Sequence, residues 1–317
     1  RSGEAHTVSI PNERAGILVQ SEGAYWIQWR EADGPLIKWG LIAIGGMLAV
    51  LLLFYLMRGR IRIEHGLSGI TIQRFDALER FGHWLLAGSF ILLALTGLNL
   101  LLGKEFLMPL IGKEAFATVS NAGKWVHNNV AWPFMAGLVL VFFLWVLHNM
   151  PSKHDIKWLM MAGGLFSEGV HPPSRKFNAG QKLIFWSTIL LGGSVSASGI
   201  ALLFPFELPM FAKTFQVLNS LGAGAVLGAP LPETLTPIQE MQYAQIWHTI
   251  VAIAMIVIII AHIYIGSVGM EGAFDAMGSG QVDRNWALEH HGLWVEEVEA
   301  EARSPGAKPG AAPTPAE

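Results

Sequence analysis

Long apolar runs alternate with shorter polar segments along most of this 317-residue chain. A membrane-spanning helix needs about 20 apolar residues, and five runs are long enough. They are Trp39–Met57, Trp84–Leu102, Val126–Leu147, Leu183–Phe204 and Ile246–Gly269. The pattern therefore predicts an all-α membrane protein with five spans, in which neighbouring helices accommodate Pro133 inside the third span.

The polar segments set the domain boundaries. We expect an exported polar leader, an extra transmembrane helix, a four-helix transmembrane bundle, a cytoplasmic tail and a disordered end rich in Pro, Ala and Gly. These parts correspond to residues 1–36, 37–57, 72–270, 271–303 and 304–317. Residues 206–240 are expected to form a long outer loop with a short surface helix.

Basic residues between the spans predict the orientation, because short loops rich in lysine and arginine face the cytoplasm. The loop after the first span and the loop between the third and fourth are the basic ones. They carry Arg58, Arg60, Arg62, Arg74, Arg80, Lys153, Lys157, Arg175, Lys176 and Lys182. We therefore expect the N-terminus outside and the C-terminus in the cytoplasm. A cleaved signal peptide would explain an exported leader that begins with Arg1.

The amino-acid composition excludes several kinds of metal and cofactor sites. The chain contains no cysteine, which excludes disulfides, thiolate zinc sites, iron–sulfur ligation and covalent c-type haem attachment by this chain. Any metal must therefore bind histidine, methionine or oxygen ligands. The net charge of -3 gives no indication of a nucleic-acid partner.

The eleven histidines fall into two groups. Six lie in polar loops or tails, where we expect most to be solvated: His6, His65, His154, His171, His290 and His291. The other five lie within the spans or at their ends: His83, His127, His148, His248 and His262. Polar side chains inside a membrane are costly and usually have a function.

The expected depths of four of these histidines in the membrane predict two pairs. His248 and His262 share the last span, about 40° apart around the helix axis and about 21 Å apart along it, so they cannot contact each other. The alternating directions of the spans pair His83 with His262 near the inner side and His127 with His248 near the outer side. Two such pairs favour two b-type haems, each bound by two imidazoles within a helical bundle.

Other interpretations of the histidines stay open at this point. A lone intramembrane histidine is often a structural hydrogen-bonding residue, zinc would need a third ligand, and a proton relay would need carboxylates within the spans. His148 could replace His83 or His262 as an inner ligand, although we favour a structural role near the inner propionates. Small residues at Gly192–Gly199 allow either helices or a macrocycle to approach closely.

Five motifs then indicate a family. They are RFGHW at Arg80–Trp84, HNMPSKHDIKWL at His148–Leu159, KFNAGQK at Lys176–Lys182, AHIYIG at Ala261–Gly266 and GQVDRNWALEHHGLW at Gly280–Trp294. In order and spacing, the chain over residues 72–300 resembles the cytochrome b (gamma) subunit of membrane-bound, quinone-linked formate dehydrogenase. The extra first span, the polar residues after His127 and the long outer loop depart from that pattern.

The resemblance implies a four-helix bundle with two b haems. It implies the same ligands as the depth argument: His83 and His262 for the inner haem, His127 and His248 for the outer one. It also implies a quinone, either ubiquinone or menaquinone, beside the inner haem near KFNAGQK. Asn178 and Gln181 are then candidate quinone-binding residues, because an amide can donate to a quinone carbonyl; the alternative role for Asn178 is a helix cap.

The implied function is formate:quinone oxidoreduction in anaerobic or formate respiration, at the bacterial inner membrane. A molybdenum or tungsten alpha subunit oxidises formate outside, and an iron–sulfur beta subunit passes electrons to the outer haem. Electrons then cross to the inner haem and reduce the quinone on the cytoplasmic side. This chain alone is not expected to oxidise formate. The alternatives are the cytochrome b subunit of a nickel–iron hydrogenase and a non-redox membrane anchor or transporter.

Overall fold

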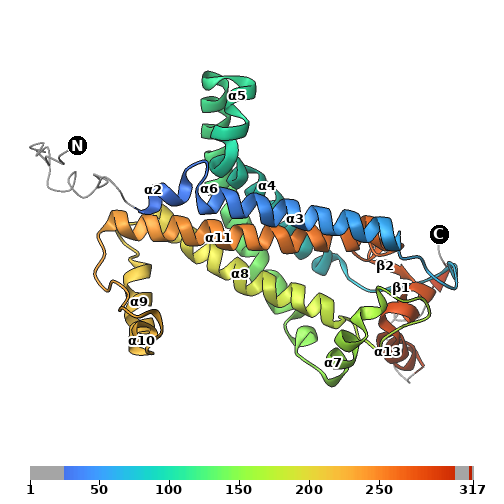
Figure 1. Ribbon diagram of the computed structural model, residues 1–317. Coiled ribbons are helices and arrows are strands. Elements are labelled where there is room, and N and C mark those ends of the chain that lie inside the picture. The colour runs from blue at the N-terminus through green and yellow to red at the C-terminus, as the bar shows by residue number, and fades with distance from the viewer. Residues whose placement is uncertain (1–24, 304–313, 316–317) are drawn as a thin grey trace, which may run out of the picture. The chain divides into compact units, whose positions relative to one another are not determined.

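The computed structural model of the protein describes residues 25–303 and 314–315. Five of its helices are long and apolar enough to cross a membrane (Figure 1). They cover Gln28–Arg58, Ala77–Phe106, Lys113–Trp145, Ala179–Leu203 and Pro237–Gly269. The five predicted spans and the helical fold class are thus confirmed, although the second, third and fifth helices extend well beyond their apolar runs.

Shorter elements connect the spans. The helices in chain order are α2 (Tyr25–Arg30), α3 (Pro35–Arg58), α4 (Ala77–Phe106), α5 (Met108–Ile111), α6 (Lys113–Trp145), η1 (Leu147–Asn149), α7 (Lys153–Met160), η2 (Ala162–Gly164), α8 (Ala179–Leu203), α9 (Met210–Ser220), α10 (Ala223–Leu227), α11 (Pro237–Tyr264), η3 (Ile265–Gly269), α12 (Asp275–Gly278) and α13 (Arg284–Ala302). The helices α9 and α10 lie in the loop where one short helix was predicted. Most of the predicted disordered tail and the predicted leader up to residue 24 lie outside the described residues.

A small sheet lies outside the spans. Strands β1 (Ile70–Gln73), β2 (Gln281–Asp283) and β3 (Thr314–Pro315) are ordered β2-β1-β3, and both pairings are antiparallel. Ile72 pairs with Val282 in the register of β1 and β2, and both side chains are buried. The sheet joins the segment before α4 to the segment before α13.

The chain divides into two compact units. The smaller comprises the chain up to Gly40 together with Ser194–Val251. Within it, the carboxylate of Glu240 accepts hydrogen bonds from the backbone N–H groups of Phe211 and Ala212, each at 2.8 Å. These bonds satisfy donors at the start of α9 that have no partner within the helix.

The larger unit comprises Leu41–Gly193 and Ala252–Glu317. Its α4 and α6 pack against each other over much of their length. A Cβ atom at Gly137 would lie 3.0 Å from the backbone of Leu86, so glycine permits this close approach. Many large apolar side chains remain exposed, among them Leu95 at 62% and Phe143 at 72%. Such surface is stable in contact with lipid rather than water.

Candidate functional site

The structure brings the two predicted inner histidines together. His83 lies in the second turn of α4 and His262 near the end of α11, and their ring centres are 6.2 Å apart with an interplanar angle of 63°. Two imidazoles on opposite sides of one metal ion, each bound at about 2 Å, have ring centres about 6 Å apart. The Nδ1 atom of His83 is buried and has no hydrogen-bond partner among the described residues. Both observations fit a shared haem iron.

The predicted outer histidine on α6 is oriented by a hydroxyl group. The Thr96 hydroxyl lies 2.9 Å from Nδ1 of His127 and donates to the carbonyl of Leu92 at 2.7 Å. Because its hydrogen is engaged, the hydroxyl oxygen accepts from Nδ1–H, and this tautomer has its lone pair on Nε2, the type of nitrogen that binds a metal. The next residue, Gly97, contacts the ring directly, since a Cβ atom there would lie 3.3 Å from Cε1 of His127.

The predicted outer histidine on α11 has the same surroundings. The Ser198 hydroxyl lies 3.1 Å from Nδ1 of His248 and donates to the carbonyl of Val195 at 3.0 Å. A Cβ atom at Gly199 would lie 3.4 Å from Cε1 of that ring. His248 lies in the smaller unit and His127 in the larger, so their pairing across one haem stays a prediction.

Sequence reasoning missed these orienting hydroxyls. The signal was present as a hydroxyl residue followed by glycine, Thr96-Gly97 in the second span and Ser198-Gly199 in the fourth. Each dipeptide supplies an acceptor for an imidazole N–H and a surface with no side chain against the same ring. The small residues of the fourth span therefore have two roles, because Gly192 packs against Leu138 of α6 instead.

A charged and aromatic cluster lies beside the inner pair. The Glu79 carboxylate accepts from the Trp145 indole N–H at 2.9 Å and from the Lys176 ammonium at 2.6 Å. Trp145 is 5.4 Å from both Phe75 and Phe177 between ring centres, and 6.5 Å from His83. The cluster thus links the inner histidine on α4 to the segment that carries KFNAGQK.

Asn178 and Gln181 form a capping box at the start of α8. The backbone N–H of Gln181 donates to the Asn178 side chain at 2.9 Å, and the N–H of Asn178 donates to the Gln181 side chain at 3.1 Å. The cap therefore exists, and it uses the two side-chain oxygens. Donation to a quinone carbonyl would use the amide nitrogens, so the cap and quinone binding are compatible. The guanidinium of Arg74 also donates to the Gln181 oxygen, at 3.3 Å.

The remaining histidines differ in their surroundings. His148 lies in η1, with its ring centre 6.5 Å from that of Phe177. Its residue is exposed, but partial desolvation of the ring and the nearby charge of Lys176 lower its pKa. His65 is solvated, with 72% of its side chain exposed. His291, expected among the solvated residues, is 1% exposed, because α13 packs it against Trp286 and the carbonyl of Arg175.

Membrane-length helices that bring two histidine rings together are typical of membrane cytochromes b. Residues 74–280 match the family model described as prokaryotic cytochrome b561. The chain therefore belongs to the prokaryotic cytochrome b561 family, and this membership implies b-type haem.

Similar proteins include cytochrome b subunits of bacterial formate dehydrogenases. The cytochrome b556(fdo) subunit of formate dehydrogenase from Escherichia coli K12 is 28% identical over 229 residues, which are 72% of this chain and 93% of the relative. The nitrate-inducible cytochrome b556(Fdn) subunit from the same strain is 28% identical over 237 residues, 73% and 94% of the two chains. The formate dehydrogenase cytochrome b556 subunit of Haemophilus influenzae is 24% identical over 229 residues, 71% and 83%. The resemblance predicted from the motifs is confirmed.

Proposed function

We propose that this chain is the dihaem cytochrome b membrane subunit of a formate dehydrogenase complex. Its partners are a molybdenum or tungsten catalytic subunit and an iron–sulfur subunit on the outer side, and its electron acceptor is a quinone on the cytoplasmic side. The electron-transfer part is carried by one observation, the 6.2 Å separation of the His83 and His262 rings. The formate part is supported by relatives of that name whose length this chain covers almost completely.

The residues of this chain hold the haems and orient the histidines that bind them. His83 and His262 hold the inner b haem, and His127 and His248 hold the outer one. Bound haem supplies reversible one-electron chemistry at two depths. Thr96 and Ser198 fix the tautomer of the outer ligands.

The quinone site lies at the start of α8. There the amide nitrogens of Asn178 and Gln181 donate to quinone oxygens while their carbonyl oxygens maintain the cap. Loops that follow the first, third and fifth spans lie on one side of the membrane, because each span reverses the direction of the chain. Two of these loops are the basic ones, which favours the cytoplasm.

Haem quantitation on the purified complex tests the proposal. We expect two b haems per chain and a broadened or split band in the reduced-minus-oxidised spectrum. His127→Ala and His248→Ala should each remove the same haem, whereas His262→Ala should remove the other. His154→Ala, in the short helix α7 outside the spans, is the matched control and should keep both. One haem per unmodified chain, or outer variants that remove different haems, would contradict the ligand assignment.

A further inference from the structure

A cavity of about 770 Å³ lies within the larger unit. It is lined by the segment after α3, by residues 163–171 and by the middle of α13, including Glu64, His171 and His290. The lining segments follow the first, third and fifth spans, so the cavity is on the membrane side where α4, which carries His83, begins and where α11, which carries His262, ends. The histidine pairs of the spans are not part of its lining.

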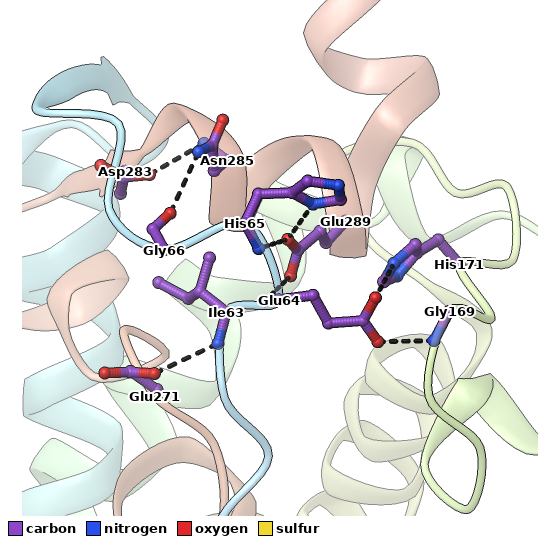
Figure 2. A network of polar contacts seen from close by, with 10 residues as sticks. All are labelled: Ile63, Glu64, His65, Gly66, Gly169, His171, Glu271, Asp283, Asn285 and Glu289. Atoms are coloured by element: carbon purple, nitrogen blue, oxygen red, sulfur yellow. Dashed lines mark hydrogen bonds and ion pairs between the residues drawn. The ribbon is translucent and has the colours of Figure 1, made fainter.

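Figure 2 shows polar contacts of Glu64, His171 and Glu289, three ionisable residues that line this cavity. The Glu64 carboxylate accepts from the N–H of Gly169 at 2.6 Å and contacts the His171 ring at 3.2 Å. The Glu289 carboxylate accepts from the backbone N–H groups of Glu64 and His65 and contacts the His65 ring at 2.9 Å. Hydrogen bonds from Gly169 foremost, and then from His171, lower the pKa of Glu64. Glu64 is therefore a carboxylate at neutral pH, in a wall that also contains Arg58, Arg60 and Arg62.

A buried polar cluster continues inward from the cavity. His290 lines the cavity, and its ring centre lies 5.2 Å from that of Trp286. The His291 ring centre lies 5.5 Å from the centre of the same indole, and the Arg74 guanidinium carbon lies 5.1 Å from it. The backbone of α13 leaves the helical conformation at His291, which places the two adjacent rings in different surroundings.

Four polar atoms of this cluster are buried without a protein partner among the described residues. They are Nε and Nη1 of Arg74, Nε1 of Trp286 and Nε2 of His290. Such groups are rare in folded proteins and generally bind water or a ligand. Their occurrence together, beside a polar cavity, distinguishes this cluster from a purely apolar core.

The cluster reaches the proposed quinone site through Arg74. One of its guanidinium nitrogens donates to the carbonyl of Lys176 at 2.7 Å and to the Gln181 side chain at 3.3 Å. Gln181 is paired with Asn178 in the cap of α8. Polar groups thus occur from the cavity to the amides at the start of α8, with the Trp286 indole between His290 and Arg74.

We propose that this cavity and the His290–His291–Arg74 cluster form the proton-uptake route for quinone reduction, an inference that rests on the proposed function. Reduction of a quinone to a quinol consumes two electrons and two protons, and both carbonyl oxygens become hydroxyl groups. The electrons come from formate oxidation in the partner subunit. The protons come from water in the cavity, and His290 accepts a proton at one ring nitrogen as it releases one from the other.

The electrostatics of the cluster suit this role. Glu289, Glu64, His171 and Arg74 are the charged or titratable groups that act on His290. Burial lowers the pKa of His290 to about 4, so at neutral pH its ring is uncharged and has one donor and one acceptor nitrogen. Burial also lowers the pKa of Arg74, to about 9, against the opposing effect of Glu79. The cation therefore persists at pH 7, where it favours the anionic form of a partly reduced quinone.

Rapid mixing of the whole complex with a short-chain quinone tests the route. The haems are first reduced with formate, and their reoxidation and the uptake of protons by a pH dye are then followed. In His290→Ala we expect both rates to fall by at least about tenfold, with a larger solvent deuterium isotope effect and an unchanged haem spectrum. Added imidazole should restore the rate, because the cavity admits it.

Glu64→Gln at the cavity wall is the second variant. It removes the carboxylate with little change in side-chain size, and it should slow proton uptake. Glu297→Gln, which removes an exposed partner of Arg175, is the control and should match the unmodified complex. The inference is wrong if both cavity variants react at the unmodified rate, or if His290→Ala is slow but insensitive to imidazole and to deuterium. An unmodified complex that reduces no quinone would instead overturn the proposed function, and the route with it.

Discussion

Each outer histidine meets a hydroxyl and a glycine at adjacent positions of a neighbouring helix. Thr96 and Gly97 of α4 contact His127, and Ser198 and Gly199 of α8 contact His248. The hydroxyl fixes the tautomer that leaves Nε2 available, and the glycine leaves room for the ring. Because an orienting partner tunes metal affinity by about 10–100-fold, these residues matter nearly as much as the ligands.

Gly97→Leu should displace the His127 ring. A Cβ atom at position 97 would already lie 3.3 Å from Cε1, whereas one at Gly88 of the same helix would have no neighbour within 4 Å. Overpacking of this kind costs about 1–3 kcal/mol, and we expect the outer haem to be lost or weakly bound. Gly88→Leu is the matched control and should retain two haems. Equal haem content in the two variants would show that Gly97 does not shape the site.

Asn178→Asp separates the two roles of Asn178. The carboxylate retains an oxygen for the N–H of Gln181, so the α8 cap and the haem content should persist. The amide donor is lost, and quinone reduction should fall by about tenfold, the effect of removing a hydrogen bond of about 1.4 kcal/mol. Quinone titrations of haem reoxidation measure the change. A rate equal to that of the unmodified protein would leave Asn178 with the capping role alone.

At the scale of elements, the apolar runs predicted where spans exist but not where their helices begin. The run at Trp84 is preceded by Asp76 and Glu79, whose reciprocal hydrogen bonds start α4 at Ala77. Polar residues there end an apolar run yet favour a helix start. The strands were missed because each has only two to four residues. Burial of His291 was missed because it depends on tertiary packing, which a polar tail sequence does not reveal.

The ion pair between Lys182 and Asp155 joins α8 to α7. The ammonium contacts the carboxylate at 2.9 Å, and their side chains are 10% and 17% exposed. Lys182→Met leaves a mostly buried carboxylate unpaired, so we expect a loss of about 2–3 kcal/mol, at the low end for buried pairs. Thermal loss of haem absorbance in detergent measures it. Lys153→Met, an exposed change at the start of α7, is the control and should melt like the unmodified protein.

The same pair predicts a dependence of stability on pH. Burial raises the pKa of Asp155, but hydrogen bonds from Lys182 and Ser152 outweigh it, and the net shift is downward. A carboxyl group whose pKa is lower in the folded state stabilises the fold above its unfolded pKa of about 4. This contribution is lost as the pH falls further, through the folded pKa. Asp155→Asn should therefore flatten the melting temperature against pH below about 4; an unchanged slope would contradict this coupling.

At the scale of the whole molecule, the chain is arranged around the two sides of a membrane. The first, third and fifth spans are followed by the segments that form the cavity, the small sheet and the capping box of α8. In the proposed topology, the segment with α9 and α10 follows the fourth span and belongs to the other side. If the basic side is cytoplasmic, electrons from an outer partner move inward and protons are taken up inside. Each charge so moved stores about 2.3 kcal/mol per 100 mV.

Cysteine labelling can establish this orientation, because the chain has no cysteine of its own. Ser220, at the end of α9, and Lys157, in α7, are both exposed and lie on opposite sides by the number of spans between them. A membrane-impermeant maleimide should label Ser220→Cys in intact spheroplasts but Lys157→Cys only after permeabilisation. The reverse pattern would put the quinone site outside. Electrons from an outer partner would then not cross the membrane to reach the quinone, and quinone reduction could not build a membrane potential by this route.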